Sequence, residues 1–383
     1  MLITHEATRT GAPMIVLQFV RWLRTARPGM RIDIVALAGG ELEADLRAIA
    51  DRYYSPSSTP IPIQALRGRV LAKMRRGLLG SSTPPAQAWQ ERHLIELAGN
   101  GYELIYANTV VSVPFASRLA ALAHRRVKLL AHVHELNVVM ATSVSKLGQY
   151  LDRIDHFIAA SGLVKEHLEQ HWQVTSSRID VVHEFSSISG PLPAPWQDRP
   201  HILEVGGAGT VHWRKGDDVF IQVARYLRDH YPDVPAQFTW VGMIGSKQAA
   251  IVRGDLEKMG LLDRVRFVGE REDPVGFFRA MDVFLLPSRE DPFPLVCIEM
   301  GMLGRPIICF DRATGIAEVV RLGGGAIVPY LNIEAMAEKV ADYHTDRERM
   351  RADGAAAHEL FSRFTADRQC PLILECMESL CRS

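Results

Sequence analysis

The chain has few cysteines and no long apolar run. Its five cysteines are odd in number and irregularly spaced among 383 residues, which excludes a disulfide scaffold and a zinc site of the paired CxxC type. No apolar run reaches the roughly 18 to 20 residues of a membrane span. The first ten residues hold only a short apolar start, unlike a secretory signal peptide. We therefore expect free thiols and a cytoplasmic protein.

An excess of charge of one sign is also missing. Lys plus Arg and Asp plus Glu number 44 each, so net charge suggests no nucleic-acid partner. Hydrophobic residues make up 47% and charged residues 23%, an ordinary globular composition that can bury a sizeable core. The length favours two domains.

Strand-like and helix-like segments alternate along the whole chain. Repeated strand-helix units predict an α/β fold with parallel sheets covered by helices on both faces. A segment rich in proline and serine, 186–199, divides two such series and predicts a linker between two Rossmann-like domains. The expected strands are 31–37, 103–108, 127–134, 156–161 and 178–183 in the first series, and 201–207, 236–242, 264–270, 282–288 and 305–310 in the second.

A basic segment, 66–79, carries five Arg and Lys side chains between Leu, Val and Met. It is typical of an amphipathic helix. One interpretation is a solvated helix face. The other is contact with a membrane surface or an anionic acceptor.

In open α/β sheets, ligands bind beyond the carboxyl ends of the strands, and three loops of the second series are placed there. The first contains Gly207 and Gly209, where a dinucleotide fingerprint would add a third glycine in place of His212. It ends in Arg214 and Lys215, whose cations would bind a phosphate. The alternative is a plain surface turn with two solvated cations.

The second loop follows the expected strand 264–270. Gly269 would let a planar base lie against the main chain of Gly269, Glu270 and Arg271. This signal is weak, because turn glycines are common.

The third loop leads into a helix at Pro294. Proline suits the first helical position, since its missing N–H would be unpaired there anyway. The N–H groups of Leu295, Val296 and Cys297 would then be free at the positive end of the helix. That is a site for a phosphate group.

Two carboxylates flank this phosphate site. Asp291 lies before the helix, and Glu299 lies one turn into it on the same face as Leu295 and Val296. Carboxylates form bidentate hydrogen bonds with vicinal hydroxyl groups. The spacing therefore indicates a nucleotide diphosphate-sugar, with ribose at one acid and the sugar at the other.

The segment 288–308 resembles the signature Glu-x7-Glu segment of the retaining family 4 glycosyltransferases, which have the two-domain glycosyltransferase-B fold. The resemblance places Asp291, where the family usually has Glu, at the first acid and Glu299 at the second. It leaves open whether Glu290 shares the role of Asp291. The Lys-Gly segment at Lys215 is similar to the family's phosphate-binding segment. The family's usual arginine upstream is missing, and Arg214 stands beside the lysine instead.

The same resemblance extends over most of the chain. It implies that Gly11 begins the first helix, with its main chain near the donor phosphate, and that His134 lies near the transferred sugar. We expect His132 to face away from His134. The implied domains are an acceptor-binding domain, 1–187, a donor-binding domain, 188–360, and a terminal helix, 361–383, that crosses back to the first domain.

The expected reaction is retaining transfer of a hexose-type sugar from a UDP- or GDP-sugar to a glycan or lipid-linked glycan, in surface polysaccharide biosynthesis. Asp291, His134 and Lys215 are the expected catalytic residues. No Asp-x-Asp metal-diphosphate clip is present, so no metal is expected. A nucleotide-sugar epimerase of the same fold and a non-catalytic nucleotide-sugar-binding protein remain alternatives. A nicotinamide dehydrogenase is disfavoured by His212.

Overall fold

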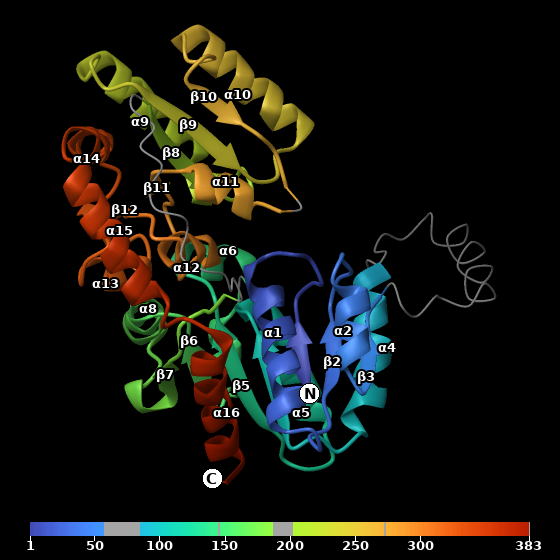
Figure 1. Cartoon of the computed structure of the whole chain (residues 1–383). Coiled ribbons are helices and arrows are strands. Elements are labelled where there is room, and N and C mark those ends of the chain that lie inside the picture. The colour runs from blue at the N-terminus through green and yellow to red at the C-terminus, as the bar shows by residue number, and fades with distance from the viewer. Residues whose placement is uncertain (57–84, 145, 187–201, 272, 383) are drawn as a thin grey trace, which may run out of the picture. The chain divides into compact units, whose positions relative to one another are not determined.

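The computed structural model describes residues 1–56, 85–144, 146–186, 202–271 and 273–382, with the side chains of 85–88 left aside (Figure 1). The chain forms two compact units. Unit 1 comprises Met1–Ala159, Leu168–Asp180 and Cys370–Ser383, and unit 2 comprises Ala160–His167 and Val181–Gln369. The linker expected at 186–199 lies outside the described residues except for Ser186, and the basic segment 66–79 lies wholly outside them.

Unit 1 contains a seven-stranded sheet in the order β3-β2-β1-β4-β5-β6-β7. Its recorded strand pairs are parallel. The strands are β1 Leu2–Thr4, β2 Asp33–Ala36, β3 Arg52–Tyr54, β4 Leu104–Asn108, β5 Lys128–Val133, β6 His156–Ala159 and β7 Ile179–Val181. The helices are α1 Gly11–Ala26, α2 Glu43–Ile49, α4 Pro85–Ala98, α5 Val113–Leu122, α6 Asn137–Ser143, α7 Gly148–Leu151 and α8 Gly162–Trp172, and short 3₁₀ turns lie at Val110–Ser112 and Ser176–Arg178.

Unit 2 contains a six-stranded parallel sheet in the order β10-β9-β8-β11-β12-β13. Its strands are β8 Leu203–Ala208, β9 Ala236–Val241, β10 Val265–Phe267, β11 Val283–Leu286, β12 Ile307–Phe310 and β13 Gly325–Val328. Its helices are α9 Asp217–His230, α10 Ser246–Met259, α11 Val275–Ala280, α12 Leu295–Met302, α13 Ile316–Val320, α14 Ile333–Thr345 and α15 Arg347–Phe361, with a 3₁₀ turn at Trp213–Lys215.

The core of unit 2 lies on both faces of its sheet. Alternate residues of β11 point to opposite faces, as strand geometry requires. Val283 and Leu285 pack with residues of α9 and α14, whereas Phe284 and Leu286 pack with residues of α12 and α15. Both faces are therefore covered by helices, which explains why the sequence of β11 is uniformly apolar. Burial of each such apolar side chain contributes about 1.5 to 3 kcal/mol to the stability of the folded state.

The expected alternation of strands and helices is confirmed. Besides the short first strand, β1, two strands lie outside the expected ranges. Both lie at an edge: β3 ends the sheet of unit 1 and β13 ends the sheet of unit 2. Only Tyr54 of β3 and Val328 of β13 are buried. An edge strand has one partner and little apolar pattern, so its sequence carries a weak signal.

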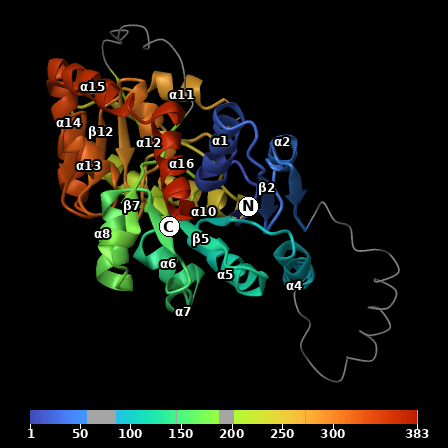
Figure 2. The same cartoon turned by 90° about the horizontal axis from the view of Figure 1, so that it is seen from below.

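The last helix, α16 Ala366–Arg382, returns to unit 1 as expected. Both views show it beside α1 (Figures 1 and 2). An ion pair of 3.0 Å joins Arg27, just beyond α1, to Glu378 of α16. Among the described residues, no helix combines the length and the apolar character that crossing a bilayer demands.

Candidate functional site

In unit 2, the strand order reverses direction between β8 and β11. These strands are neighbours, with Val205 opposite Val283, although 74 residues lie between the end of β8 and the start of β11. Such a switch point leaves a crevice at the carboxyl ends of the strands, where open α/β sheets bind ligands. The loop with Arg214 and Lys215 follows β8, and the loop with Asp291 follows β11. The sheet therefore brings together the two loops that the sequence singled out.

Asp291 lies at the centre of a buried polar cluster. Its Oδ1 accepts a hydrogen bond from Arg214 Nη1 at 3.0 Å, and its Oδ2 accepts one from Lys215 Nζ at 2.6 Å. The Ser288 hydroxyl donates to the same Oδ2 at 3.1 Å. The Asp291 side chain is only 5% exposed, so these partners replace water around the carboxylate. We name Arg214, Lys215, Ser288 and Asp291 the Asp291 cluster.

The charges of this cluster depend on one another. Burial lowers the pKa of Lys215, and the neighbouring charge of Asp291 opposes that effect, with a net lowering. Burial alone raises the pKa of Asp291, but the charges of Lys215 and Arg214 hold it below its usual value. With two cations and one carboxylate, the cluster carries a net positive charge that suits an anionic ligand.

The structure requires a glycine at position 216 of the Lys-Gly segment. Gly216 adopts the left-handed region with φ 72°, which side chains disfavour. A Cβ at this position would lie 2.0 Å from the carbonyl oxygen of Pro287, which follows β11. Only glycine lets the first loop approach the end of β11 closely enough for Lys215 to reach Asp291.

The start of α12 differs slightly from the expectation. The helix begins at Leu295, and Pro294 is the residue before it, with φ −64° and ψ 128°. The expected free N–H of Cys297 was wrong, because this group donates to the Pro294 carbonyl at 3.0 Å. Within the described part of the chain, no hydrogen bond is recorded for the N–H groups of Leu295 and Val296. These two amides lie at the N-terminal end of the helix, where the helix dipole is positive.

Lys215 lies near this first turn of α12. Burial raises the pKa of the Cys297 thiol well above its usual value, and the ammonium of Lys215 opposes the rise. The same helix carries Glu299, whose Oε1 accepts a hydrogen bond from the Ser186 hydroxyl at 3.1 Å. Burial raises the pKa of Glu299 to about 7, and that hydrogen bond opposes the rise. Near neutral pH, Glu299 therefore exists in both charge states.

Gly269 and Glu270 follow β10, which is separated from β8 by β9 in the sheet order. Gly269 has φ 74°, and a Cβ placed on it would meet no described atom within 4 Å. Its carbonyl accepts a hydrogen bond from the N–H of Gly242 at 3.0 Å. The main chain here is fixed and open on the side where a side chain would stand, as a planar base would require.

Unit 1 has the same switch point between β1 and β4. Helix α1 begins at Gly11, as expected, and a Cβ on Gly11 would meet open space. Asn108, the last residue of β4, donates from Nδ2 to the Ala12 carbonyl at 3.0 Å. Its Oδ1 therefore faces His134 Nε2, at 2.7 Å, as an acceptor. The pair fixes the ring of His134 with the proton on Nε2.

The expectation for His132 was wrong. Its ring lies 3.9 Å from the ring of His134, centroid to centroid, because residues two apart in extended chain share a face. The Tyr106 hydroxyl contacts His132 Nδ1. Burial, followed by the neighbouring His134, lowers the pKa of His132 well below its usual value, so this imidazole is neutral.

Sequence reasoning missed two hydroxyl groups at the site. Ser288 donates to Asp291, and Ser186 donates to Glu299. Ser288 stands three residues before the acid it binds, a spacing that could have suggested a local hydrogen bond. Ser186 is 113 residues from Glu299, so no local pattern could reveal that pair.

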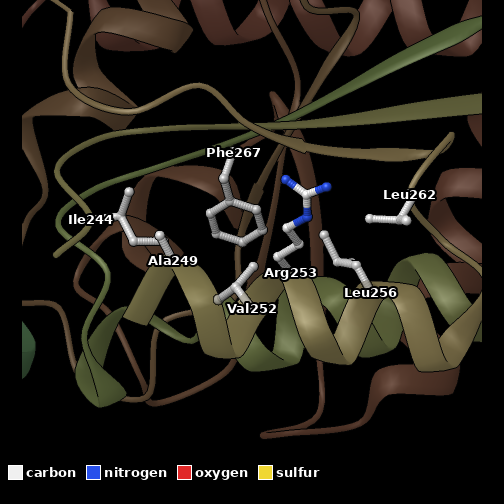
Figure 3. A pocket seen from close by; sticks show the side chains of 7 residues that line it. All are labelled: Ile244, Ala249, Val252, Arg253, Leu256, Leu262 and Phe267. Atoms are coloured by element: carbon white, nitrogen blue, oxygen red, sulfur yellow. The ribbon is translucent and has the colours of Figure 1, made fainter. Parts of the chain in front are cut away.

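An apolar cavity lies elsewhere in unit 2 (Figure 3). Its volume is about 180 Å³. Val252, Arg253 and Leu256 extend from α10 toward Phe267 of β10. None of the residues expected at the site lines this cavity; the remaining lining residues are Ile244, Ala249 and Leu262.

Comparison with known proteins matches both halves of the chain. The family model described as Glycosyltransferase Family 4 matches residues 10–185, and the model described as Glycosyl transferases group 1 matches residues 199–346. The chain belongs to the family 4 glycosyltransferases. Its two parallel sheets and its returning helix are those of the glycosyltransferase-B fold. The Anabaena protein HepE, solved in complex with UDP and glucose, superposes with a TM-score of 0.77 over 99% of this chain and 98% of its own, at 18% identity.

Two curated relatives are similar in sequence to part of this family 4 glycosyltransferase. An exopolysaccharide phosphotransferase of Streptomyces coelicolor is 33% identical over 256 residues, which is 66% of this chain and 26% of that protein. The lipopolysaccharide core biosynthesis mannosyltransferase LpsB of Rhizobium meliloti is 28% identical over 189 residues, which is 46% of this chain and 52% of that protein. The matched regions thus span about a quarter and about half of these two relatives.

Proposed function

We propose that this protein is a retaining glycosyltransferase that moves a hexose-type sugar from a UDP- or GDP-sugar to a glycan or lipid-linked glycan. The observation that carries the proposal is the Asp291 cluster beside the first turn of α12. It places two cations and two helix N-terminal amides at one strand switch point. That combination suits a diphosphate.

The donor is assigned to unit 2. Lys215, Arg214 and the amides of Leu295 and Val296 would bind the diphosphate, and Glu299 would accept hydrogen bonds from ribose hydroxyls. The main chain at Gly269 and Glu270 would lie against the base. Membership in family 4 supports a nucleotide-sugar donor, and the UDP and glucose bound by HepE make a uridine donor one choice to test.

The proposed mechanism depends on the negative charge that develops on the departing diphosphate. The bond between the anomeric carbon and the β-phosphate oxygen breaks, and the departing diphosphate gains negative charge. An acceptor hydroxyl forms the new bond from the same face, and its proton passes to the departing phosphate oxygen. Lys215, Arg214 and the α12 dipole would stabilise that charge with groups already in place. These groups neutralise the diphosphate without a metal ion, so we propose a metal-independent reaction.

Unit 1 is assigned to the acceptor. Helix α1 begins at Gly11, and its N-cap residue, Thr10, forms no side-chain hydrogen bond that would cap the helix. The first amides of α1 can therefore approach a phosphate. His134, fixed by Asn108, would contact the transferred sugar. The names of the two curated relatives support surface polysaccharide as the setting. We further propose that the protein acts at the cytoplasmic face of a membrane.

Incubation with UDP- and GDP-sugars tests the proposal. Acceptor-dependent release of UDP or GDP, in the presence of a chelator, is the expected result. A changed sugar still attached to its nucleotide would indicate an epimerase instead. Binding without turnover over a panel of glycan and lipid-linked acceptors would indicate a non-catalytic binding protein.

A further inference from the structure

We propose that His132 is a positioning residue that holds the imidazole of His134 in one fixed orientation at the switch point of unit 1. This inference rests on the proposed function, in which His134 contacts the transferred sugar. His132 itself is only 1% exposed, so it acts through the ring of His134 and not by touching a substrate.

Four side chains on one face of the sheet of unit 1 form two neighbouring pairs. In the parallel register of β4 and β5, Asn108 lies opposite His132. Side chains two residues apart share a face, which places Tyr106 beside Asn108 and His134 beside His132. The Tyr106 hydroxyl contacts His132, and Asn108 contacts His134. The first three side chains are buried and His134 is partly exposed, so the group presents this one imidazole at the strand ends.

The two imidazole rings are in direct contact. Their centroids lie 3.9 Å apart, and their planes meet at 40°. Asn108 Oδ1 accepts from His134 Nε2 at 2.7 Å, and this hydrogen bond by itself fixes one nitrogen but leaves the ring free to tilt. The ring of His132 packs against His134 and blocks that tilt. Together the two contacts fix both the nitrogen and the plane of the His134 ring.

His132 can support another ring because it is itself fixed. The Tyr106 hydroxyl contacts Nδ1 of His132, and the two rings meet edge to face with centroids 5.9 Å apart. Tyr106 in turn packs against Phe19 of α1, at 6.1 Å between ring centroids. All three side chains are at most 1% exposed. In a close-packed interior, such rings cannot turn without displacing their neighbours.

A histidine at this buried position is not explained by packing. A neutral imidazole has one donor and one acceptor nitrogen. Tyr106 engages Nδ1, whereas Nε2 is buried and has no hydrogen-bond partner among the described residues. An unpaired buried polar group lowers stability, and leucine would fill much of the same space without that cost. A local rule is broken here, as is typical of residues that serve a functional site.

The chain beside the two histidines is strained. Thr109 has φ 78° and ψ 154°, a conformation that β-branched residues rarely adopt. Its N–H donates to the carbonyl of His132 at 2.9 Å. The N–H of Val110 donates to Glu135 Oε2 at 3.2 Å, and the N–H of His134 donates to the same oxygen at 3.0 Å. Such strain persists where surrounding contacts over-determine the main chain, and it clusters at active sites.

A double-mutant cycle on turnover tests the inference. The proteins are wild type, His132→Leu, His134→Gln and the double variant, assayed for UDP or GDP release from the sugar donor that the wild type uses. We expect His132→Leu to lower kcat about tenfold to hundredfold, with the donor KM nearly unchanged. In the His134→Gln background the same replacement should cause no further loss, because the ring that His132 positions is gone. Calorimetric titration of UDP and GDP should show unchanged affinity, since the nucleotide binds to unit 2.

Other outcomes overturn the inference. An equal loss of kcat in both backgrounds would show that His132 acts independently of His134, as a merely structural residue would. Normal kcat in a folded His132→Leu protein would show that the ring contact has no role in turnover. Absence of turnover by the wild-type protein over the donor and acceptor panel would refute the proposed function and, with it, the inference.

A second variant covers the case in which His132→Leu does not fold. Tyr106→Phe keeps the buried ring and removes the hydroxyl that contacts His132. We expect it to lower kcat about twofold to tenfold by loosening the ring that supports His134, again without further loss in the His134→Gln background. Unchanged kcat in a folded Tyr106→Phe protein contradicts the positioning role.

Discussion

Replacement of Glu299 by glutamine should have opposite consequences for stability and for donor binding. Glu299 is partly buried in the second turn of α12, and burial raises its pKa from 4.5 to about 7. A group whose pKa is higher in the folded state binds its proton more tightly there. It therefore supports folding at low pH, and that support is lost as the pH rises from about 4.5 through 7.

The magnitude follows from the size of the shift. Each pKa unit corresponds to about 1.4 kcal/mol, so the raised pKa of Glu299 corresponds to about 3 kcal/mol. The ionised carboxylate thus costs the folded protein about that much above pH 8. Relative to wild type, we expect Glu299→Gln to gain up to about 3 kcal/mol in unfolding free energy between pH 4 and pH 8. Other titrating groups cancel in this difference.

The affinity for the donor nucleotide should rise with pH, opposite to the contribution of Glu299 to folding stability. An ionised Glu299 accepts hydrogen bonds from ribose hydroxyls better than a protonated one, so UDP or GDP affinity should rise as the pH passes 7. Glu299→Gln should bind more weakly at pH 8 and lose this pH dependence. Ser186→Ala offers a matched control. It removes the hydrogen bond that opposes the raised pKa, so the wild-type profile should move to higher pH.

The assays are urea unfolding and calorimetric titration of UDP and GDP, each at several pH values from 5 to 8.5. A nucleotide affinity that rises equally across pH 7 in wild type and Glu299→Gln would refute the assignment. So would a difference in unfolding free energy that does not change with pH.

Three further substitutions test the local geometry. Gly216→Ala should lower the unfolding free energy by more than about 2 kcal/mol, because its Cβ would strike the Pro287 carbonyl at 2.0 Å in a left-handed conformation. Gly269→Ala meets open space at a similar φ and should cost only about 1 kcal/mol in urea unfolding, yet weaken nucleotide binding in titration. Asn108→Leu removes the hydrogen bonds to His134 and to α1 and should cost about 1 to 3 kcal/mol by the same unfolding measurement.

Much of the fold was predictable from local patterns. Buried parallel strands are short apolar runs, and helices between them carry a longer period, so the sequence predicted the alternation of elements and two sheets. The strands β3 and β13 escaped prediction because an edge strand is half exposed and short. The division of α8, whose first residues belong to unit 2, likewise depends on contacts distant in sequence.

For the site, the residue types and the loops came from the sequence alone: a Lys-Gly segment, a proline before a helix and two acids eight positions apart. These patterns are local, and helix geometry and side-chain chemistry follow directly from them. What the tertiary structure decided is the partnership of Asp291. The sequence placed Asp291 at a sugar and Lys215 at a phosphate, but the β8 and β11 switch point brings them within 2.6 Å across 76 residues of chain. Such a contact depends on strand order, which no local pattern contains.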